Sequence, residues 1–386
     1  MEIKSKGRDA SAGCRSIDDA YEKTLAEVLS GIPKGEDLRT AAQRGRGLFP
    51  AEVKRWFLEH RDHNFPLVDT ARGNDSAPIQ PELHMLDGEW YFTDETSRAL
   101  ADLVPANSSL LLGAPTVAAA MKEPGSLLID NSPFILRRFP GSATRWIKAD
   151  VRTVEPRGGY DAAVVDPPWC MADLYGWMRM ASQAVRPGGV IYAPLLGECT
   201  RPAAARQRDL LLEYLSASGE VTVDKDLVEY AVPLFEHRSL VAARAPVDGP
   251  WRRADLLQLR VQTALPAPPA VTEDTSVLGD WETYLLGGQV VKLRRPVRPA
   301  PGANLIAPLE ALGGYALTSV SRRDGNLSHV DLWTSRNAVA KVLDFVAVRS
   351  ALRQLDGDNM GLPARAELLR DAQGRRVDAL LHILEI

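Results

Sequence analysis

The sequence has few cysteines and no long apolar run, and both absences exclude classes of protein. The three cysteines, Cys14, Cys170 and Cys199, are too few and too scattered for a disulfide framework, and no C-x-x-C pair is present to nucleate a zinc site. No stretch of about 18 apolar residues occurs, and the polar N-terminus lacks the apolar core of a signal peptide. We therefore expect no metal site, no membrane segment and a cytoplasmic location.

An excess of charge of one sign is also missing. The 46 basic and 50 acidic residues give a formal net charge of −4, so no overall field attracts the chain to nucleic acid or to an anionic membrane. Any nucleic-acid binding must therefore come from a local patch. Internal repeats with periods of about 20 to 50 residues are absent as well, which excludes solenoids and propellers.

The length of 386 residues, with 45% apolar and 25% charged residues, is typical of a globular protein of two or three domains. The texture of the sequence changes several times along the chain. We predict a flexible tail, a helical region, a domain of alternating strands and helices, a Pro-rich linker and an α+β region, over residues 1–15, 16–106, 107–245, 246–272 and 273–386.

In the N-terminal region, apolar residues at helical spacing predict two helices, one on Ile17, Tyr21, Leu25, Val28 and Leu29 and one on Val53, Trp56 and Phe57. A short hairpin around Asp87-Gly88 and a helix capped at Thr93 or Thr96 follow. This order suggests a winged-helix-like module. A helical collar packed on the next domain accounts for the pattern equally well.

In the central region, short apolar runs alternate with helical segments. The runs, several of which end in Gly or Asp, are 109–113, 126–130, 146–150, 162–166 and 190–193. The stretches 116–122 and 172–185 between them are typical of helices. Strands alternating with helices predict an α/β fold with a largely parallel sheet covered on both faces. Residues 227–234 and 239–244 are interpreted as an antiparallel pair at its edge.

The C-terminal region begins with a predicted hairpin around Gly287-Gly288. From about Ser335 to the end the pattern becomes helical, with a final amphipathic helix over 364–384. The first helical stripe consists of Val339, Val342, Leu343, Phe345 and Val346.

The tetrapeptide Asp166-Pro167-Pro168-Trp169 directly follows the apolar run AAVV. Ligands of open parallel sheets bind at the carboxyl ends of the strands, where this segment lies. The Asp166 carboxylate can accept a hydrogen bond from an exocyclic amino group, and the rigid Pro-Pro turn can point the Pro167 carbonyl at the same group. The Trp169 indole offers a face on which a flipped-out base can stack.

This tetrapeptide resembles the signature of class I S-adenosylmethionine-dependent amino-methyltransferases, and its DPPW form is similar to that of adenine N6 methyltransferases. The resemblance implies a Rossmann-like methyltransferase domain that uses S-adenosylmethionine. The turn Val185-Arg186-Pro187-Gly188-Gly189 before the fifth run resembles the turn at that place in such enzymes. The mRNA adenosine-methylating family has a permuted order, so the wider match, over about residues 107–245, is to unpermuted enzymes.

The same resemblance implies a set of residues for the methyl donor. The first strand leads into a loop that the family places under the methionine portion of the donor, here with one glycine where the family usually has several; it consists of Gly113, Ala114, Pro115 and Thr116. Asp130 ends the second strand, followed by Asn131, where an acidic side chain binds ribose hydroxyls. Asp130 can alternatively cap the next turn. Asp150 ends the third strand and would contact the donor adenine, or else pair with Arg152 or Arg145.

Phosphate contacts would have to come from clustered arginines. The densest group surrounds Arg294, Arg295 and Arg298 in a proline-bounded segment that we expect to be exposed. The pair Arg252-Arg253 is a further candidate. Charge runs are also common on solvated faces that bind nothing.

From the sequence we hypothesise methyl transfer from S-adenosylmethionine to an exocyclic amino nitrogen, most simply adenine N6 in DNA or RNA. Asp166, Pro167, Pro168 and Trp169 would form the catalytic motif. Two alternatives stay open. One is methylation of a protein side-chain amine, and the other is a catalytically silent scaffold that binds nucleic acid or a partner. A second copy of the chain is another candidate partner.

Overall fold

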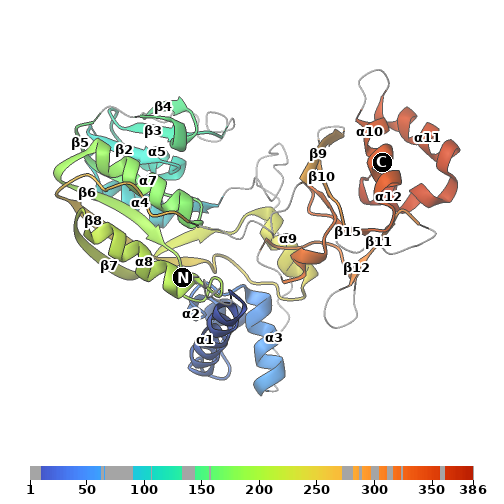
Figure 1. The fold of residues 1–386 in the computed structure, drawn as a ribbon, viewed down its shortest axis with the longest axis horizontal. Helices are drawn as coiled ribbons and strands as arrows, with labels where there is room; N and C mark the ends of the chain where they lie inside the picture. The colour runs from blue at the N-terminus through green and yellow to red at the C-terminus, as the bar shows by residue number, and fades with distance from the viewer. Residues whose placement is uncertain are drawn as a thin grey trace, which may run out of the picture.

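The computed structural model describes the chain except for residues 1–9, 62–64, 66–89, 106, 133–143, 156–157, 272–280, 287–288, 297–303, 311–315, 323–324, 357–360 and 386. Three lobes are visible in Figure 1: a central lobe built on a large sheet, a group of N-terminal helices below it, and a C-terminal lobe on the other side of helix α9. Among the described residues, no helix is both long enough and apolar enough to cross a membrane.

The central lobe contains an eight-stranded sheet with the order β1-β7-β8-β6-β5-β2-β3-β4. Strands β4, β3, β2, β5 and β6 are parallel neighbours. They follow the 3-2-1-4-5 order of a doubly wound, Rossmann-like sheet, as the sequence predicted. The strands are β1 (Tyr91–Phe92), β2 (Ser109–Leu112), β3 (Leu127–Asp130), β4 (Arg145–Lys148), β5 (Tyr160–Val165), β6 (Val185–Leu195), β7 (Gly219–Ala231) and β8 (Arg253–Val261).

Helices cover both faces of this sheet, which is why its central strands are apolar along their whole length. Leu110 and Leu112 of β2 face α7 and α8, whereas Leu111 between them faces α4 and α5. Thr93 caps the start of α4, which settles the choice between Thr93 and Thr96. The helices are α4 (Asp94–Leu103), α5 (Pro115–Ala120), α7 (Met171–Ala184) and α8 (Ala204–Ser216), with a 3-10 turn η2 (Val151–Thr153).

The antiparallel edge of the sheet differs from the sequence prediction. β8 lies between β6 and β7 and is antiparallel to both, although its residues fall inside the stretch interpreted as a Pro-rich linker. Residues 239–244, predicted as a strand, lie mostly in helix α9 (Leu234–Ala242). The two errors have different causes: short apolar runs do not distinguish a strand from a helix turn, and flanking prolines suggest a linker even where a strand lies between them.

The N-terminal lobe consists of α1 (Ala10–Ser30), α2 (Leu38–Arg44) and α3 (Pro50–Arg61), which confirms the two predicted helices. Phe57 of α3 packs in one core with Leu240 of α9 and with Trp251. β1 and α4 belong instead to the central lobe, because β1 pairs with β7. The N-terminal helices thus pack against α9 and the segment before β8. The predicted hairpin around Asp87-Gly88 lies outside the described residues.

The C-terminal lobe has a five-stranded antiparallel sheet in the order β11-β15-β14-β10-β9. β9 and β10 pair as the predicted hairpin, with Leu286 opposite Gln289. The predicted helical stripe from Val339 was wrong at its start, since Val339–Val342 forms β15. The final predicted helix is divided into α11, a 3-10 turn η5 (Gly374–Val377) and α12. The strands and helices are β9 (Trp281–Leu286), β10 (Gln289–Arg294), β11 (Ile306–Ala307), β12 (Leu309–Glu310), β13 (Ala316–Leu317), η4 (Gly325–His329), β14 (Leu332–Thr334), β15 (Val339–Val342), α10 (Phe345–Leu355), α11 (Leu362–Gln373) and α12 (Asp378–Ile383).

Helix α9 joins the C-terminal lobe to the rest of the molecule. The Ser321 hydroxyl is hydrogen-bonded to both carboxylate oxygens of the buried Glu236 on α9, at 2.9 and 3.0 Å. The Asn337 side-chain amide donates to the Phe235 carbonyl at 2.8 Å. These hydrogen bonds connect the C-terminal lobe to α9 through largely buried polar groups.

Candidate active site

The best candidate site lies at the carboxyl edge of the central sheet, where the strand order reverses. β2 and β5 are neighbours there and lead to opposite sides of the sheet, which is the usual place for a ligand in open α/β folds. Gly113 follows β2 and Asp166 follows β5. The Asp166 N–H donates to the Leu112 carbonyl at 2.9 Å, which holds the start of the DPPW segment against the end of β2.

Gly113 is required by the backbone at this point. Its φ of +62° lies in the left-handed region, and a Cβ there would lie 2.7 Å from the Trp177 ring and 3.0 Å from the Asp166 carbonyl oxygen. Ala114 then serves as the N-cap of α5, and Pro115 occupies its first turn. The predicted tight turn opening a helix is confirmed, with a single glycine at the place of closest approach.

Asp130 lies at the end of β3 and is only 8% exposed. One of its carboxylate oxygens accepts a hydrogen bond from the Ser132 N–H at 2.8 Å, so the capping role that the sequence left open is present. Its charge also acts on Asp166 and raises the pKa of that carboxyl group. The two carboxylates are therefore close enough for their charges to repel each other. Asn131 beside it is exposed.

Asp150 follows β4 and is engaged by its own turn. Its carboxylate pairs with the Arg152 guanidinium at 2.6 Å and also accepts the Arg152 backbone N–H at 2.9 Å. These bonds hold the pKa of Asp150 below its usual value. Pairing with Arg152 was one of the alternatives that the sequence left open.

Asp166 is the most perturbed carboxyl group of the site. Burial raises its pKa to about 7, although the Tyr230 hydroxyl, which donates to it at 2.8 Å, and the positive charge of Arg252 act in the opposite direction. Near neutral pH this group therefore exists in both protonation states. A titratable group tuned in this way at a strand end is typical of a functional site.

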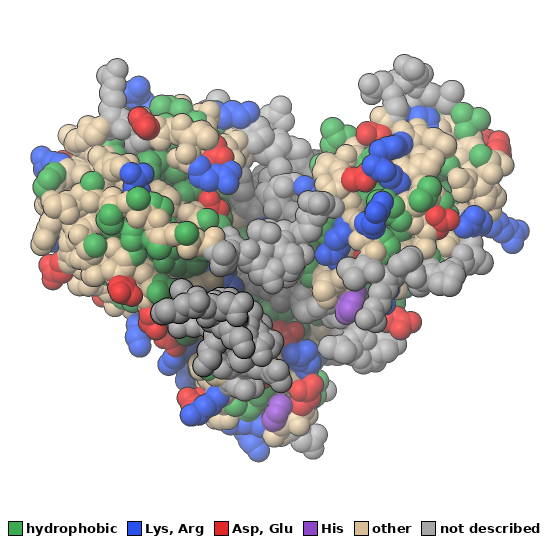
Figure 2. Space-filling model, viewed as in Figure 1, with side chains coloured by type: hydrophobic (Ala, Val, Ile, Leu, Met, Phe, Trp, Pro, Cys, Tyr) green, Lys and Arg blue, Asp and Glu red, His purple; other side chains and the backbone are tan. Residues whose placement is uncertain are grey.

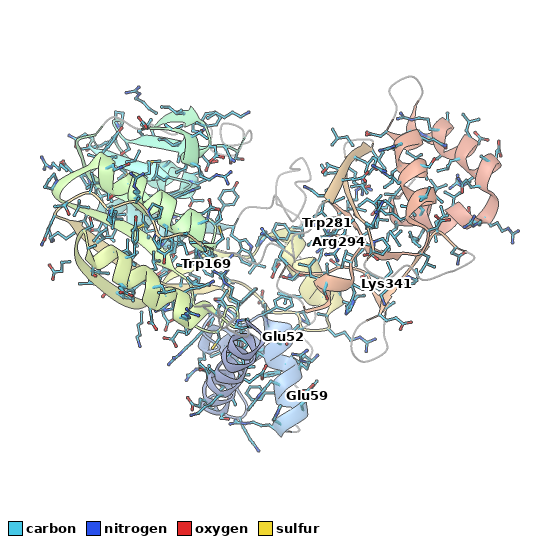
Figure 3. The ribbon with its side chains drawn as sticks, in the orientation of Figure 1. Glu52, Glu59, Trp169, Trp281, Arg294 and Lys341 are labelled. Carbon is cyan, nitrogen blue, oxygen red and sulfur yellow. The ribbon has the colours of Figure 1, made fainter. Side chains whose placement is uncertain are left out.

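The remaining members of the tetrapeptide have separate environments. Pro167 is buried and Pro168 is exposed. The Pro168 carbonyl accepts the Cys170 N–H at 2.8 Å and so helps to start α7, whereas no hydrogen bond to the Pro167 carbonyl is found among the described residues. The Trp169 ring is partly exposed and lies on the central lobe, on its side toward the N-terminal helices in the view of Figure 3.

Sequence reasoning missed three neighbours of this motif, which are Arg252, Trp90 and Tyr230. The Arg252 guanidinium lies over the rings of Trp169, Trp90 and Tyr230, with its Cζ atom 3.8, 4.5 and 4.7 Å from their centroids. Arg252 is only 7% exposed, so it is not the surface residue that its place in an Arg-Arg pair suggested. No local pattern points to this cluster, because the chain brings together β7, the start of β8 and the segment before β1.

The arginines predicted to bind nucleic acid do not form one exposed group. Arg294 is half-buried, stacks over Trp281 at 4.9 Å and donates to the carbonyls of Leu327 and Ser328, so the expectation that it is exposed was wrong. Arg295 is exposed and lies 5.3 Å from the Phe345 ring centroid. Arg298 lies outside the described residues. On the face shown in Figure 2, basic and acidic side chains are interspersed on all three lobes.

The residues around Gly113 fit part of a nucleoside donor. Thr116 Oγ1 and Trp177 Nε1 are both buried, and neither has a hydrogen-bond partner among the described residues. Buried polar atoms without partners are costly, and a bound polar ligand is one way to satisfy them. The amino-acid and ribose portions of S-adenosylmethionine suit the groups present here, which are the Gly113 backbone, the Thr116 hydroxyl, the Trp177 indole N–H and the Asp130 carboxylate. In the described part of the chain, no cluster of side chains suited to a metal ion is present.

Comparison with known proteins gives likenesses of fold. No family model matches the chain, and no curated protein matches it by sequence. A variant of the branched-chain polyamine synthase of Thermus thermophilus, in complex with N4-aminopropylspermidine and 5'-methylthioadenosine, is 14% identical with a TM-score of 0.46, over 69% of this chain and 96% of that one.

Two methyltransferases are also similar in structure. The 16S rRNA methyltransferase RsmC of T. thermophilus, in complex with AdoMet and guanosine, is 14% identical with a TM-score of 0.29, over 54% of this chain and 48% of that one. The N-methyltransferase NodS of Bradyrhizobium japonicum is 14% identical with a TM-score of 0.30, over 43% and 93%. At such identities and scores the likeness does not extend to cofactor, substrate or reaction.

Proposed function

We propose that the protein transfers a methyl group from S-adenosylmethionine to an exocyclic amino nitrogen, and that the amine is N6 of adenine in DNA or RNA. The observation that carries the proposal is the placement of Asp166-Pro167-Pro168-Trp169 at the end of β5, at the point where the strand order reverses. This is where a doubly wound sheet binds its ligands, and the motif supplies the acceptors that an amino group needs.

In this proposal the site residues divide between donor and substrate. Gly113, Ala114, Pro115 and Thr116 line the methionine portion of the donor, Asp130 with Asn131 holds the ribose, and Asp150 contacts the adenine. When bound, S-adenosylmethionine supplies an electrophilic methyl group. The protein contributes orientation of the reacting atoms, which is a large part of catalysis when two molecules must meet in line.

Asp166 and Pro167 act on the substrate amine. The carboxylate accepts one N–H and the Pro167 carbonyl accepts the other, so the nitrogen lone pair is held in a fixed direction. Because the pKa of Asp166 is about 7, its carboxylate can also take up the proton that the amine loses near neutral pH. Trp169 packs against the flat ring that carries the amine, while Pro168 keeps the turn rigid.

Transfer of tritium from labelled donor tests the proposal. The full-length protein is incubated with labelled S-adenosylmethionine and, separately, with DNA, RNA and a protein mixture. We expect label in nucleic acid, and a loss of at least about a hundredfold in Asp166→Ala, because an orienting group that also accepts a proton is removed.

Three outcomes contradict the proposal in different ways. Label on protein alone would favour a side-chain amine as substrate. Unchanged activity in Asp166→Ala would overturn the mechanism. Absence of binding in calorimetry at millimolar donor would favour a silent scaffold.

A further inference from the structure

The guanidinium of Arg252 fills the corner between two aromatic rings of the candidate site. The rings of Trp169 and Tyr230 are nearly perpendicular, at 81°, with centroids 5.8 Å apart. The Arg252 Cζ atom is 3.8 Å from one centroid and 4.7 Å from the other. A separation of 3.8 Å is van der Waals contact, so the guanidinium lies directly on the indole. These distances together place Tyr230 and Arg252 on the same side of Trp169.

One face of Trp169 is therefore occupied by the protein itself. Trp169 is partly buried and also packs against both hydrophobic clusters of the central lobe. A flat substrate ring cannot stack on the face that Arg252 covers.

The backbone holds Arg252 in this position. The Tyr230 N–H donates to the Arg252 carbonyl at 3.0 Å, and the next residue, Arg253, pairs with Glu229 at 3.3 Å. Trp90 closes a further side of the guanidinium at 4.5 Å. With 7% exposure and three rings around it, Arg252 is placed to act inside the site and not on a phosphate outside it.

The charge of Arg252 also reaches the carboxylate of the motif. Three groups act on Asp166: the Tyr230 hydroxyl on β7, Arg252 just before β8 and Asp130 at the end of β3. Arg252 is the cation among them. It favours the charged form of Asp166, against both burial and the charge of Asp130.

We propose that Arg252 is a positioning residue of the methyl-transfer site: it fixes the Trp169 indole and closes one of its faces to the substrate ring, and it keeps Asp166 able to accept the substrate amine. The inference rests on the proposed function, because it assigns Arg252 a role through Trp169 and Asp166.

Two substitutions separate the roles of shape and charge. Arg252→Met keeps a long side chain and removes the charge, whereas Arg252→Lys keeps the charge and removes the planar group that lies flat on Trp169. Arg253→Met is the matched control, since Arg253 is the adjacent arginine and pairs with Glu229 instead. The titration of Asp166 is followed by 13C NMR of its carboxyl carbon, assigned with Asp166→Asn, and needs no substrate.

In Arg252→Met we expect the titration midpoint of Asp166, and the acidic limb of kcat/KM with it, to move to higher pH. In Arg252→Lys we expect the midpoint to stay near that of the wild type while KM for the amine rises roughly threefold to tenfold. Arg253→Met should leave the titration midpoint of Asp166 unchanged. A merely structural role for Arg252 would not split the two variants in this way.

The inference and the proposed function fail in distinguishable ways. A wild-type protein that binds donor but methylates no amine overturns the proposed function, and the role of Arg252 in the reaction with it. An active wild type, with Asp166 titration and KM both unchanged in Arg252→Met, overturns the inference alone. If Arg252→Met does not fold, as judged by near-UV circular dichroism, the Lys variant still decides: unchanged KM in it contradicts the positioning of Trp169.

Discussion

The molecule contains two pairs in which an arginine lies over a tryptophan, and they differ in what surrounds them. In the C-terminal lobe, Arg294 lies 4.9 Å from Trp281 and donates to the carbonyls of Leu327 and Ser328 at 3.0 and 2.9 Å. At the edge of the central sheet, Arg252 lies 3.8 Å from Trp169 beside Asp166. Figure 3 shows the first pair near α9 and Trp169 on the central lobe, well apart.

The clearest difference lies in one carboxyl group and one backbone angle. Asp166 has a pKa raised to about 7, and Gly113 has a positive φ. Both regions contain buried polar atoms without a hydrogen-bond partner among the described residues: Thr116 Oγ1 and Trp177 Nε1 at the sheet edge, and Arg294 Nε and Trp281 Nε1 in the C-terminal lobe. Since perturbed pKa values and unusual backbone conformations gather at functional sites, the first two features favour the sheet edge as the functional site, whereas Arg294 donates to carbonyls of its own lobe.

The largest effect should come from Gly113→Ala, because Gly113 lies where the backbone at the sheet edge is most closely packed against its neighbours. A Cβ there meets Trp177 and the Asp166 carbonyl and forces a side chain into positive φ, so we expect a loss of roughly 2–5 kcal/mol of unfolding free energy and no donor binding. Denaturant unfolding measures the loss of unfolding free energy, and calorimetry measures donor binding. Gly176→Ala, in α7 with open space around its Cβ, is the control and should be neutral or slightly stabilising. Equal donor affinity in both variants would contradict the account.

A second effect concerns the pH dependence of stability. The pKa of Asp166 is raised to about 7 in the folded protein, so its protonated form favours folding, and that contribution is lost as pH rises from about 4 through 7. Asp166→Asn removes the charge, so the variant should gain stability relative to the wild type over this range, by roughly 1–4 kcal/mol. Urea unfolding at about pH 4.5, near the start of that window, and at about pH 8.5, above it, checks this. A gap that does not widen with pH would contradict the raised pKa.

A third substitution addresses the other pair. Arg294→Met removes the hydrogen bonds that the guanidinium donates to the Leu327 and Ser328 carbonyls, and we expect a loss of about 1–3 kcal/mol in unfolding free energy with methyl transfer within about twofold of the wild type. Thermal unfolding measures the change in stability, and the tritium assay measures methyl transfer. If activity fell as far as in the Arg252 variants, the distinction between the two pairs would be wrong.

The smallest effect on stability should be that of Asp150→Ala. Its partner Arg152 is largely exposed, so the pair contributes about 0–1 kcal/mol to folding. If Asp150 also contacts the donor, the Kd of S-adenosylmethionine rises roughly threefold to tenfold. Calorimetry with S-adenosylmethionine distinguishes a donor contact from a purely structural role. An unchanged Kd would mean that Asp150 only pairs with Arg152.

Local patterns were enough to predict the parallel part of the sheet. Apolar runs such as 109–113 and 162–166 became β2 and β5 because a strand covered on both faces must be apolar throughout. Thr93 was one of two predicted caps because a capping hydroxyl is a property of two or three neighbouring residues. The motif Asp166-Pro167-Pro168-Trp169 could be singled out because it directly follows a predicted strand.

The other half of the site depends on residues that meet only after folding. Tyr230, whose hydroxyl donates to Asp166, is 64 positions away in the sequence. Arg252 lies just before β8, in a stretch interpreted as a linker. Arg252 was noted in the sequence as one of two adjacent arginines. Nothing in that dipeptide indicates that one guanidinium is buried among three rings while its neighbour pairs with Glu229.

The most direct test of the central claim is mass spectrometry of nucleosides after reaction with donor that carries a deuterated methyl group. The full-length protein is incubated with RNA or DNA, the nucleic acid is digested, and the position of the label is read from fragment masses. The account predicts the labelled methyl on the exocyclic nitrogen of adenine with wild-type protein and none with Asp166→Ala. Label on a ring carbon or on a sugar oxygen, or no transfer by protein that demonstrably binds the donor, would contradict it.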